Sequence, residues 1–252
     1  MVRSMYRKLA RSWGQQHWWP AETPFEVIVG AILTQNTSWS NVERALASLR
    51  AAKVLSVAGI RNLPLVRLQE LVYSSGYYRQ KAQRLKDFVG FLDHKHEGSL
   101  KTMFATPSDQ LRAQLLALKG IGPETADSIL LYAGNHKIFV VDAYTRRVLE
   151  RHRVVDGRAS YDQVRDLVQL ALQREKPLVS MKSTLAKKVA VHEPSAMSTI
   201  ERSELSQVYN EMHGLFVQLG KHYCLKQEPR CESCPLQTLL PDGSLAVVTA
   251  ES

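Results

Sequence analysis

Long apolar stretches are absent from this 252-residue chain. No run approaches the roughly 18 to 20 consecutive apolar residues that a membrane-spanning helix needs. The first twenty residues also lack the apolar core and the small-residue cleavage site of a secretory signal. We therefore expect an unprocessed, cytoplasmic protein with no membrane partner.

Cysteine is scarce and confined to one place. Cys224, Cys231 and Cys234 are the only three in the chain and lie within eleven residues. Disulfide frameworks normally use an even number of cysteines spread along the chain. This cluster instead predicts a reducing compartment and a candidate metal site.

Strand-forming patterns are also scarce, because apolar residues recur at helical spacing almost everywhere. We predict an all-α protein with about ten short helices. The one β-branched run, 138–141, is short and ends at Asp142, so we interpret it as an extended lead-in with Asp142 near the N-cap of the next helix. Residues 176–200 have weak periodicity and predict a mobile connection.

Acidic residues are missing from two segments of a chain whose net charge is +9. Residues 1–20 and 77–86 each carry four lysines or arginines and no acid. Such segments suit a polyanionic partner, although the faces of solvated helices have the same composition.

A helix-hairpin-helix is predicted at 111–133. One helix ends at Leu118, Gly120 and Gly122 bracket Ile121, and Pro123 opens a second helix. The glycines allow a tight turn whose N–H groups can bind a DNA phosphate, and Ile121 would fill the space between the helices. The alternative is an ordinary tight turn with no ligand.

The sequence after this hairpin, VVDAYTRRVLERH, completes a pattern that resembles the endonuclease III superfamily of DNA glycosylases. AILTQNTSW at 31–39 and the cysteine spacing extend the resemblance over nearly all of 13–240. It implies a six-helix barrel at 24–136 and a second helical lobe formed by 1–23 and 137–252, with the active site in the cleft between them. It also implies a monomer that binds double-stranded DNA with a damaged base, in the nucleoid of a bacterial-type cell.

One departure from the family pattern concerns the activity. Members that cleave the strand carry a lysine nucleophile in the second hairpin helix, and this chain has Glu124 at that position. A carboxylate cannot form the Schiff base that leads to strand cleavage. The closer resemblance is then to the 3-methyladenine glycosylase branch, which hydrolyses N-alkylated purines without cutting the strand.

The resemblance also implies roles for single residues. Asp142 would be catalytic, stabilising an oxocarbenium ion and orienting water, or would be a simple helix cap. An electron-poor alkylated base would stack on tryptophans that could equally be core residues. The substrate-binding candidates are Trp18, Trp19, Gln35, Trp39, Glu124 and Lys221, and the DNA-binding candidates are Lys119, Gly120, Ile121, Gly122 and Thr125.

The loop at 224–240 departs from the family in its ligand set. The family spacing C-x6-C-x2-C-x5-C places a fourth cysteine at 240, where this chain has Leu240. We therefore consider a 4Fe-4S cluster with an incomplete ligand set, a zinc site with His222 as the fourth ligand, or a loop that folds without metal.

Two alternative functions remain open. One keeps the fold and changes the base to thymine, uracil or an oxidised pyrimidine, which specific hydrogen-bond donors in the pocket would favour. The other is a non-catalytic, structure-specific DNA-binding protein. Asp142 argues against the second, because a carboxylate beside a phosphate track repels DNA.

Overall fold

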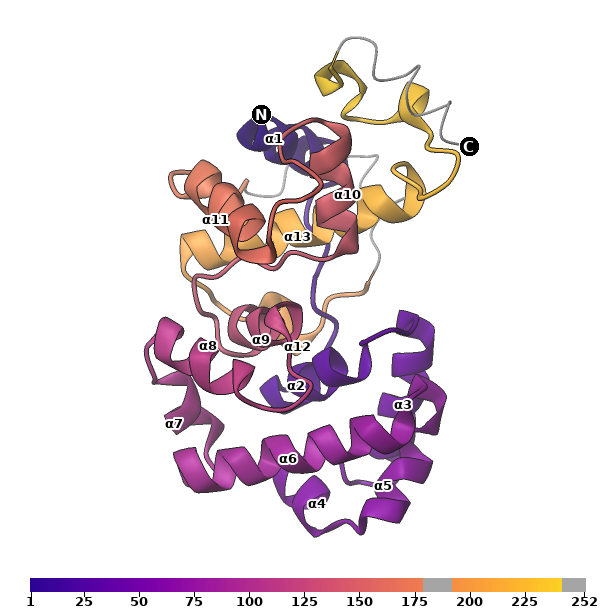
Figure 1. The fold of residues 1–252 in the computed structure, drawn as a ribbon, viewed down its shortest axis with the longest axis vertical. Coiled ribbons are helices and arrows are strands. Elements are labelled where there is room, and N and C mark those ends of the chain that lie inside the picture. The colour runs from indigo at the N-terminus through magenta and orange to yellow at the C-terminus, as the bar shows by residue number, and fades with distance from the viewer. Residues whose placement is uncertain (179–191, 242–252) are drawn as a thin grey trace. The chain divides into compact units, whose positions relative to one another are not determined.

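The computed structural model describes residues 1–178 and 192–241 (Figure 1). Every regular element in this described part is helical, which confirms the all-α prediction. The chain divides into two compact units, Ala21–His136 and Met1–Pro20 with Lys137–Ser252. Most of the predicted connection at 176–200 lies outside the described residues. No helix in the described ranges is both long and apolar enough to span a bilayer.

The unit Ala21–His136 is built around two helices, α2 and α6. Thr23 caps α2 by accepting from the Glu26 N–H, and every residue of the Pro24–Leu33 helix after Pro24 is buried. The elements of this unit are α2 (Pro24–Leu33), α3 (Trp39–Ala51), α4 (Val57–Asn62), α5 (Leu65–Leu71), η1 (Tyr73–Ser75), α6 (Tyr78–His96), α7 (Leu100–Phe104), α8 (Ser108–Leu116), α9 (Pro123–Ser128) and the π-helical turn η2 (Ile129–Ala133).

Two lysines of the basic segment 77–86 serve inside this unit. The Lys81 ammonium is buried and donates to the carbonyls of Leu33 and Ser75, at 2.8 and 2.6 Å. Lys86 donates to carbonyls near the end of α4, including that of Ile60 at 2.6 Å. Both side chains satisfy carbonyls that the ends of short helices leave without partners. Part of this positive segment therefore stabilises the fold and is not available to a partner.

The predicted hairpin is present as α8 and α9. The first helix ends at Leu116, two residues earlier than expected, and Pro123 is the first residue of α9. Gly120 has a φ of 84°, a left-handed conformation that favours glycine. Ile121 is buried, and its N–H donates to the Leu118 carbonyl.

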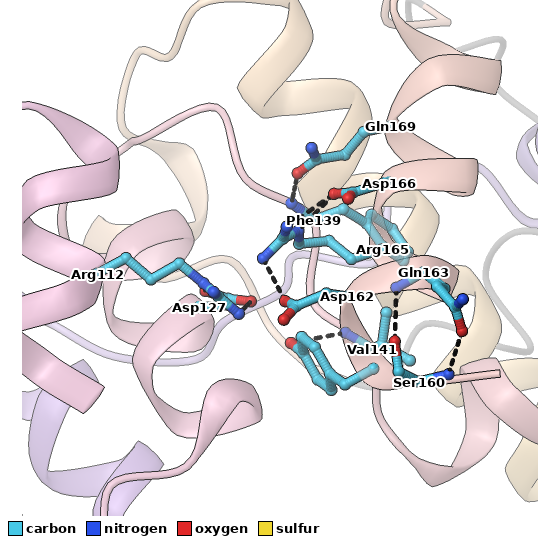
Figure 2. A network of polar contacts seen from close by, with 11 residues as sticks. Arg112, Asp127, Phe139, Val141, Ser160, Asp162, Gln163, Arg165, Asp166 and Gln169 are labelled. Atoms are coloured by element: carbon cyan, nitrogen blue, oxygen red, sulfur yellow. Dashed lines mark hydrogen bonds and ion pairs between the residues drawn. The ribbon is translucent and has the colours of Figure 1, made fainter. Parts of the chain in front are cut away.

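A buried ion pair joins the two hairpin helices. The Arg112 guanidinium donates to both carboxylate oxygens of Asp127, at 2.7 and 3.2 Å (Figure 2). The Asp127 side chain is 0% exposed and that of Arg112 is 14% exposed. Both charged groups have lost most of their contact with water, and their attraction and hydrogen bonds to each other offset that loss.

In the second unit, α1, α10 and α11 pack against α13 (Figure 1). Its elements are α1 (Val2–Trp13), α10 (Ala143–Arg151), α11 (Tyr161–Leu172), α12 (Ala196–Thr199), α13 (Glu204–His222), η4 (Cys231–Ser233) and η5 (Gln237–Leu239). Gly214 of α13 lets Gln16 and Trp18 approach closely, because a Cβ there would lie 3.2 and 3.1 Å from their Cβ atoms.

The segment 138–141 is neither helix nor strand, and side chains of α11 hold it in place (Figure 2). The Phe139 N–H donates to the Gln169 side-chain oxygen at 2.8 Å, and the Val141 N–H donates to the Tyr161 hydroxyl at 3.2 Å. These bonds satisfy two backbone N–H groups that lie outside any helix or strand. They fix the backbone immediately before Asp142.

We expect Asp127→Asn to lower the free energy of unfolding by about 3–5 kcal/mol, because it removes the buried carboxylate charge to which the mostly buried Arg112 donates. Urea denaturation monitored by circular dichroism measures this change. Glu70→Gln is the matched control, since the Arg67–Glu70 pair is exposed and such pairs contribute about 1 kcal/mol or less. Equal losses in the two variants would contradict the assignment.

Candidate active site

Asp142 lies at the N-cap of α10, as the sequence predicts. Its Oδ1 accepts from the Thr145 N–H at 2.7 Å, and its Oδ2 lies 3.5 Å from Nε2 of His213. The carboxyl is 11% exposed. Burial alone would raise its pKa, but attraction to His213 and the hydrogen bonds from His213 and Thr145 outweigh it, so the pKa of Asp142 is lowered. The structure thus holds an ionised carboxylate in a largely buried position.

His213 is a site residue that the sequence analysis missed. It lies on α13, is buried, and its ring contacts two aromatic rings, those of Trp18 and Phe139, at centroid distances of 5.8 and 6.4 Å. These contacts fix the imidazole with Nε2 beside Asp142. A lone histidine within an apolar helix carries no local motif, so only the packing of α13 against α10 identifies it.

The two adjacent tryptophans predicted to bind the base are both buried. Trp18 contacts Trp19 edge to face at 5.7 Å and also lies 5.4 Å from the ring of His192. The indole Nε1 of Trp18 and the amide Oε1 of Gln16 are buried without a hydrogen-bond partner among the described residues. A buried polar atom without a partner is costly, and one at a binding site can be satisfied by a ligand.

The charge of Lys221 affects the pKa of His192, whose ring lies beside Trp18. Burial lowers the pKa of His192 to about 4, and the positive charge of Lys221 adds to the effect. Trp18, His192 and His213 thus form a cluster beside Asp142, which we call the Trp18 cluster. Its members come from three separate segments of one unit.

Four of the predicted residues belong to the other unit, Ala21–His136. Trp39 is partly exposed and donates from Nε1 to Glu43 one turn along α3, at 2.9 Å. Glu124 is exposed in the first turn of α9, and Lys119 and Gly122 are exposed in the hairpin turn. Their predicted roles in binding the base and the DNA stay predictions.

Gln35, predicted to probe DNA, is bonded to the hairpin. Its amide nitrogen donates to the Gly120 carbonyl and to the Thr125 hydroxyl, each at 2.9 Å. Its amide oxygen accepts from the guanidinium of Arg84. The predicted DNA-binding residues Gly120 and Thr125 are therefore joined to Gln35, and Arg84 is a further member that the sequence analysis did not single out by itself.

The three cysteines line one cavity with Leu240 in place of a fourth thiol. Arg151, His152 and Tyr223 complete its walls. The Arg151 guanidinium lies 3.4 Å from the Cys224 sulfur, and burial raises the pKa of Cys234 to about 11. Burial also raises the pKa of Cys231, so these two thiols are held in the neutral form.

These residues do not fit a four-thiolate iron–sulfur cluster, which needs a fourth ligand where the aliphatic Leu240 lines the cavity. Within residues 1–178 and 192–241, no group of three or more His, Cys, Asp or Glu side chains is arranged to hold a metal ion. The zinc alternative with His222 fits no better, because His222 is exposed and is not part of the cavity wall. His152 lies there instead, and its Nδ1 bonds to the Val148 carbonyl.

We expect Leu240→Cys to bind more iron than the unchanged protein after anaerobic reconstitution, because it restores the missing thiolate. Elemental analysis and the brown colour of the cluster measure the gain. Leu239→Cys adds the same thiol one residue away, outside the cavity wall, and serves as the control. An unchanged protein that already retains four irons per chain in air would refute this interpretation of the loop.

Comparison with known proteins identifies the family. Residues 29–174 match the model described as HhH-GPD superfamily base excision DNA repair protein. A protein of Methanocaldococcus jannaschii named as a candidate DNA repair glycosylase is 38% identical over 239 residues, covering 94% of both chains. Endonuclease III of Thermotoga maritima is 25% identical over 242 residues, covering 94% of this chain and 91% of the relative.

Solved structures share the fold. A Helicobacter pylori 3-methyladenine DNA glycosylase bound to 1,N6-ethenoadenine is 28% identical, with a TM-score of 0.67 over 87% of this chain and 95% of that one. An endonuclease III trapped covalently on DNA has a TM-score of 0.72 at 20% identity over 98% and 97% of the chains. The chain belongs to the HhH-GPD superfamily of base excision repair proteins and is a DNA N-glycosylase of that family.

Proposed function

We propose that this protein is a monofunctional glycosylase that flips N-alkylated purines, of the 3-methyladenine type, out of duplex DNA and hydrolyses their glycosidic bond. The observation that carries the proposal is the ionised, largely buried Asp142 beside the Trp18 cluster. A carboxylate next to aromatic rings combines charge stabilisation with stacking, which are the two requirements of this reaction.

Asp142 supplies the charge. As the base departs, positive charge develops on the sugar, and a carboxylate held by Thr145 and His213 stabilises it without having to reorient. The same oxygens can orient or deprotonate the attacking water. Because the glycosidic bond of an alkylated purine is already weak, little further acid catalysis is required.

The base would lie against the Trp18 cluster. An electron-poor purine gains about 1–2 kcal/mol from each desolvated aromatic contact. The Trp18 Nε1 donor and the Gln16 Oε1 acceptor, both buried without partners among the described residues, are complementary to a base edge that has a ring nitrogen and an amino group. The 28% identity to a glycosylase solved with an adenine derivative supports this choice of base class.

Glu124 supports the absence of strand cleavage. It is exposed in the first turn of α9, at the position where the strand-cleaving members resembled by this chain carry their lysine. A carboxylate has no electron pair on nitrogen with which to form a Schiff base. Water is then the nucleophile, and an intact abasic strand is the product.

One observation favours a second candidate substrate. The positive charge of Lys221 acts on His192, which lies against Trp18, so a cationic base is less favoured there than a neutral one. Uracil or thymine would also present a carbonyl and an N–H to Trp18 and Gln16. Comparison of the two base classes in one assay separates the candidates.

We expect single-turnover assays to release 3-methyladenine from alkylated duplex DNA and to leave the strand uncut. Sodium borohydride should trap no covalent adduct, because no lysine attacks the sugar. Endonuclease III, tested in parallel, provides the positive control for trapping. Faster release of uracil from a deaminated duplex would favour the second candidate, whereas a trapped adduct would contradict monofunctional hydrolysis.

We expect His213→Leu to move the acidic limb of the pH profile of base release to higher pH. His213 lowers the pKa of Asp142, so its removal lets that pKa rise and the carboxylate becomes protonated at a higher pH. Single-turnover rates measured across the acidic range test the shift. His94→Leu, an exposed histidine of α6, is the control and should keep the unchanged profile. An unshifted limb in His213→Leu would assign His213 to packing alone.

A further inference from the structure

Both polar atoms of the Gln35 side chain form hydrogen bonds within the unit Ala21–His136. Its amide nitrogen bonds to the Gly120 carbonyl and the Thr125 hydroxyl, and its amide oxygen accepts from Arg84. Gln35 follows α2, Arg84 lies on α6, and the other two residues belong to the hairpin. One side chain therefore connects three elements that are distant in sequence.

Arg84 lies directly on the hairpin glycine. A Cβ at Gly120 would collide with the guanidinium, whose Cζ would be 2.8 Å away. Glycine at this position thus serves two purposes, the left-handed turn and the approach of Arg84. The bond to Gln35 keeps the guanidinium against the turn, although Arg84 itself is only half-buried.

The positive charge around Arg84 is not balanced locally. No carboxylate among the described residues forms an ion pair with Arg84. Of the other arginines of this unit, four pair with carboxylates, Arg79 lies over a tyrosine ring, and Arg44 does neither. Lys81 lies one turn away on α6, where burial and the charge of Arg84 lower its pKa to about 8. Lys119, beside Gly120, is exposed.

We propose that Arg84 is a side-chain ligand for a backbone phosphate of duplex DNA at the hairpin turn, and that Gln35 positions it there. A guanidinium matches the geometry of phosphate oxygens. Its hydrogen bonds to an anionic phosphate are stronger than its bond to the neutral amide oxygen of Gln35, because both partners are then charged. An incoming phosphate would supply the negative charge that the described part of the protein does not place beside Arg84, and Lys119 lies exposed next to the same turn. The hairpin thus binds phosphate with a positioned side chain as well as with its backbone.

Binding to an undamaged duplex tests this proposal, since it requires no base release. We expect Arg84→Gln to weaken binding at low salt by about tenfold or more, because one charge-assisted contact is lost. The slope of log K against log salt should fall by about one. Arg84→Lys should recover the slope, because it keeps the charge, and only part of the affinity, because it loses the bidentate geometry.

Arg67→Gln is the matched control. It removes the same charge from an exposed arginine of α5 that pairs with Glu70, and we expect the unchanged slope. Equal slopes for Arg84→Gln and the unchanged protein would overturn the proposal, and so would an equal fall in the Arg67→Gln control, which would assign the effect to net charge. Thermal unfolding of each variant checks that the fold is retained.

A double-mutant cycle tests the part played by Gln35. Gln35→Leu should weaken binding in the presence of Arg84 and should have little further effect in Arg84→Gln, because the two side chains then act as one unit. Additive effects would show that Gln35 acts independently of Arg84. If the duplex binds as expected but no base is released, the glycosylase proposal fails while this one stands.

Discussion

A charged carboxylate that is almost out of reach of water is the constraint on which the site depends. Asp142 remains ionised only because the first turn of α10 and His213 of α13 replace the water it has lost. This requirement fixes the backbone before it, which Gln169 and Tyr161 hold from α11. It also requires α13 to pack against α10, so that His213 lies beside Asp142. Next to His213, Gly214 has no side chain, which allows Gln16 and Trp18 to approach α13 closely. Asp142 is thus both the N-cap of α10 and the carboxylate that we propose to be catalytic, so in this proposal the same bonds serve stability and activity.

Two arginines contact the hairpin, and each is held by hydrogen bonds to a side chain of the protein. Inside it, the buried ion pair of Arg112 and Asp127 joins α8 to α9. At its turn, Arg84 is held by a neutral amide, and the positive charge stays available. The difference between the two arginines lies in their acceptors. A carboxylate acceptor makes a structural pair, whereas an amide acceptor leaves a cation suited to a phosphate.

In the cysteine loop, the spacing of three cysteines matches the family pattern, whereas the cavity that they line is completed by an aliphatic side chain. Three thiols share a cavity with Leu240, and a guanidinium lies against one sulfur. Burial raises the pKa of Cys231 and of Cys234. The fold of the loop is maintained by short turns, such as the bonds from Cys234 N–H to the Cys231 carbonyl and from Leu239 N–H to the Leu236 carbonyl.

The sequence by itself determined the helical class, the hairpin turn and the position of Asp142, because each is encoded locally by periodicity, by glycine and proline, or by a polar residue at the start of a helix. It also carried the family resemblance, which the comparisons confirmed. It did not predict His213, Gln16 or the bonds of Arg84, since their partners are distant in sequence and no local pattern marks them. Nor did it separate Lys81 and Lys86, which satisfy carbonyls inside the fold, from the cations that remain outside. Only tertiary packing decides which polar atom meets which partner, because burial removes the water that would otherwise satisfy each of them alone.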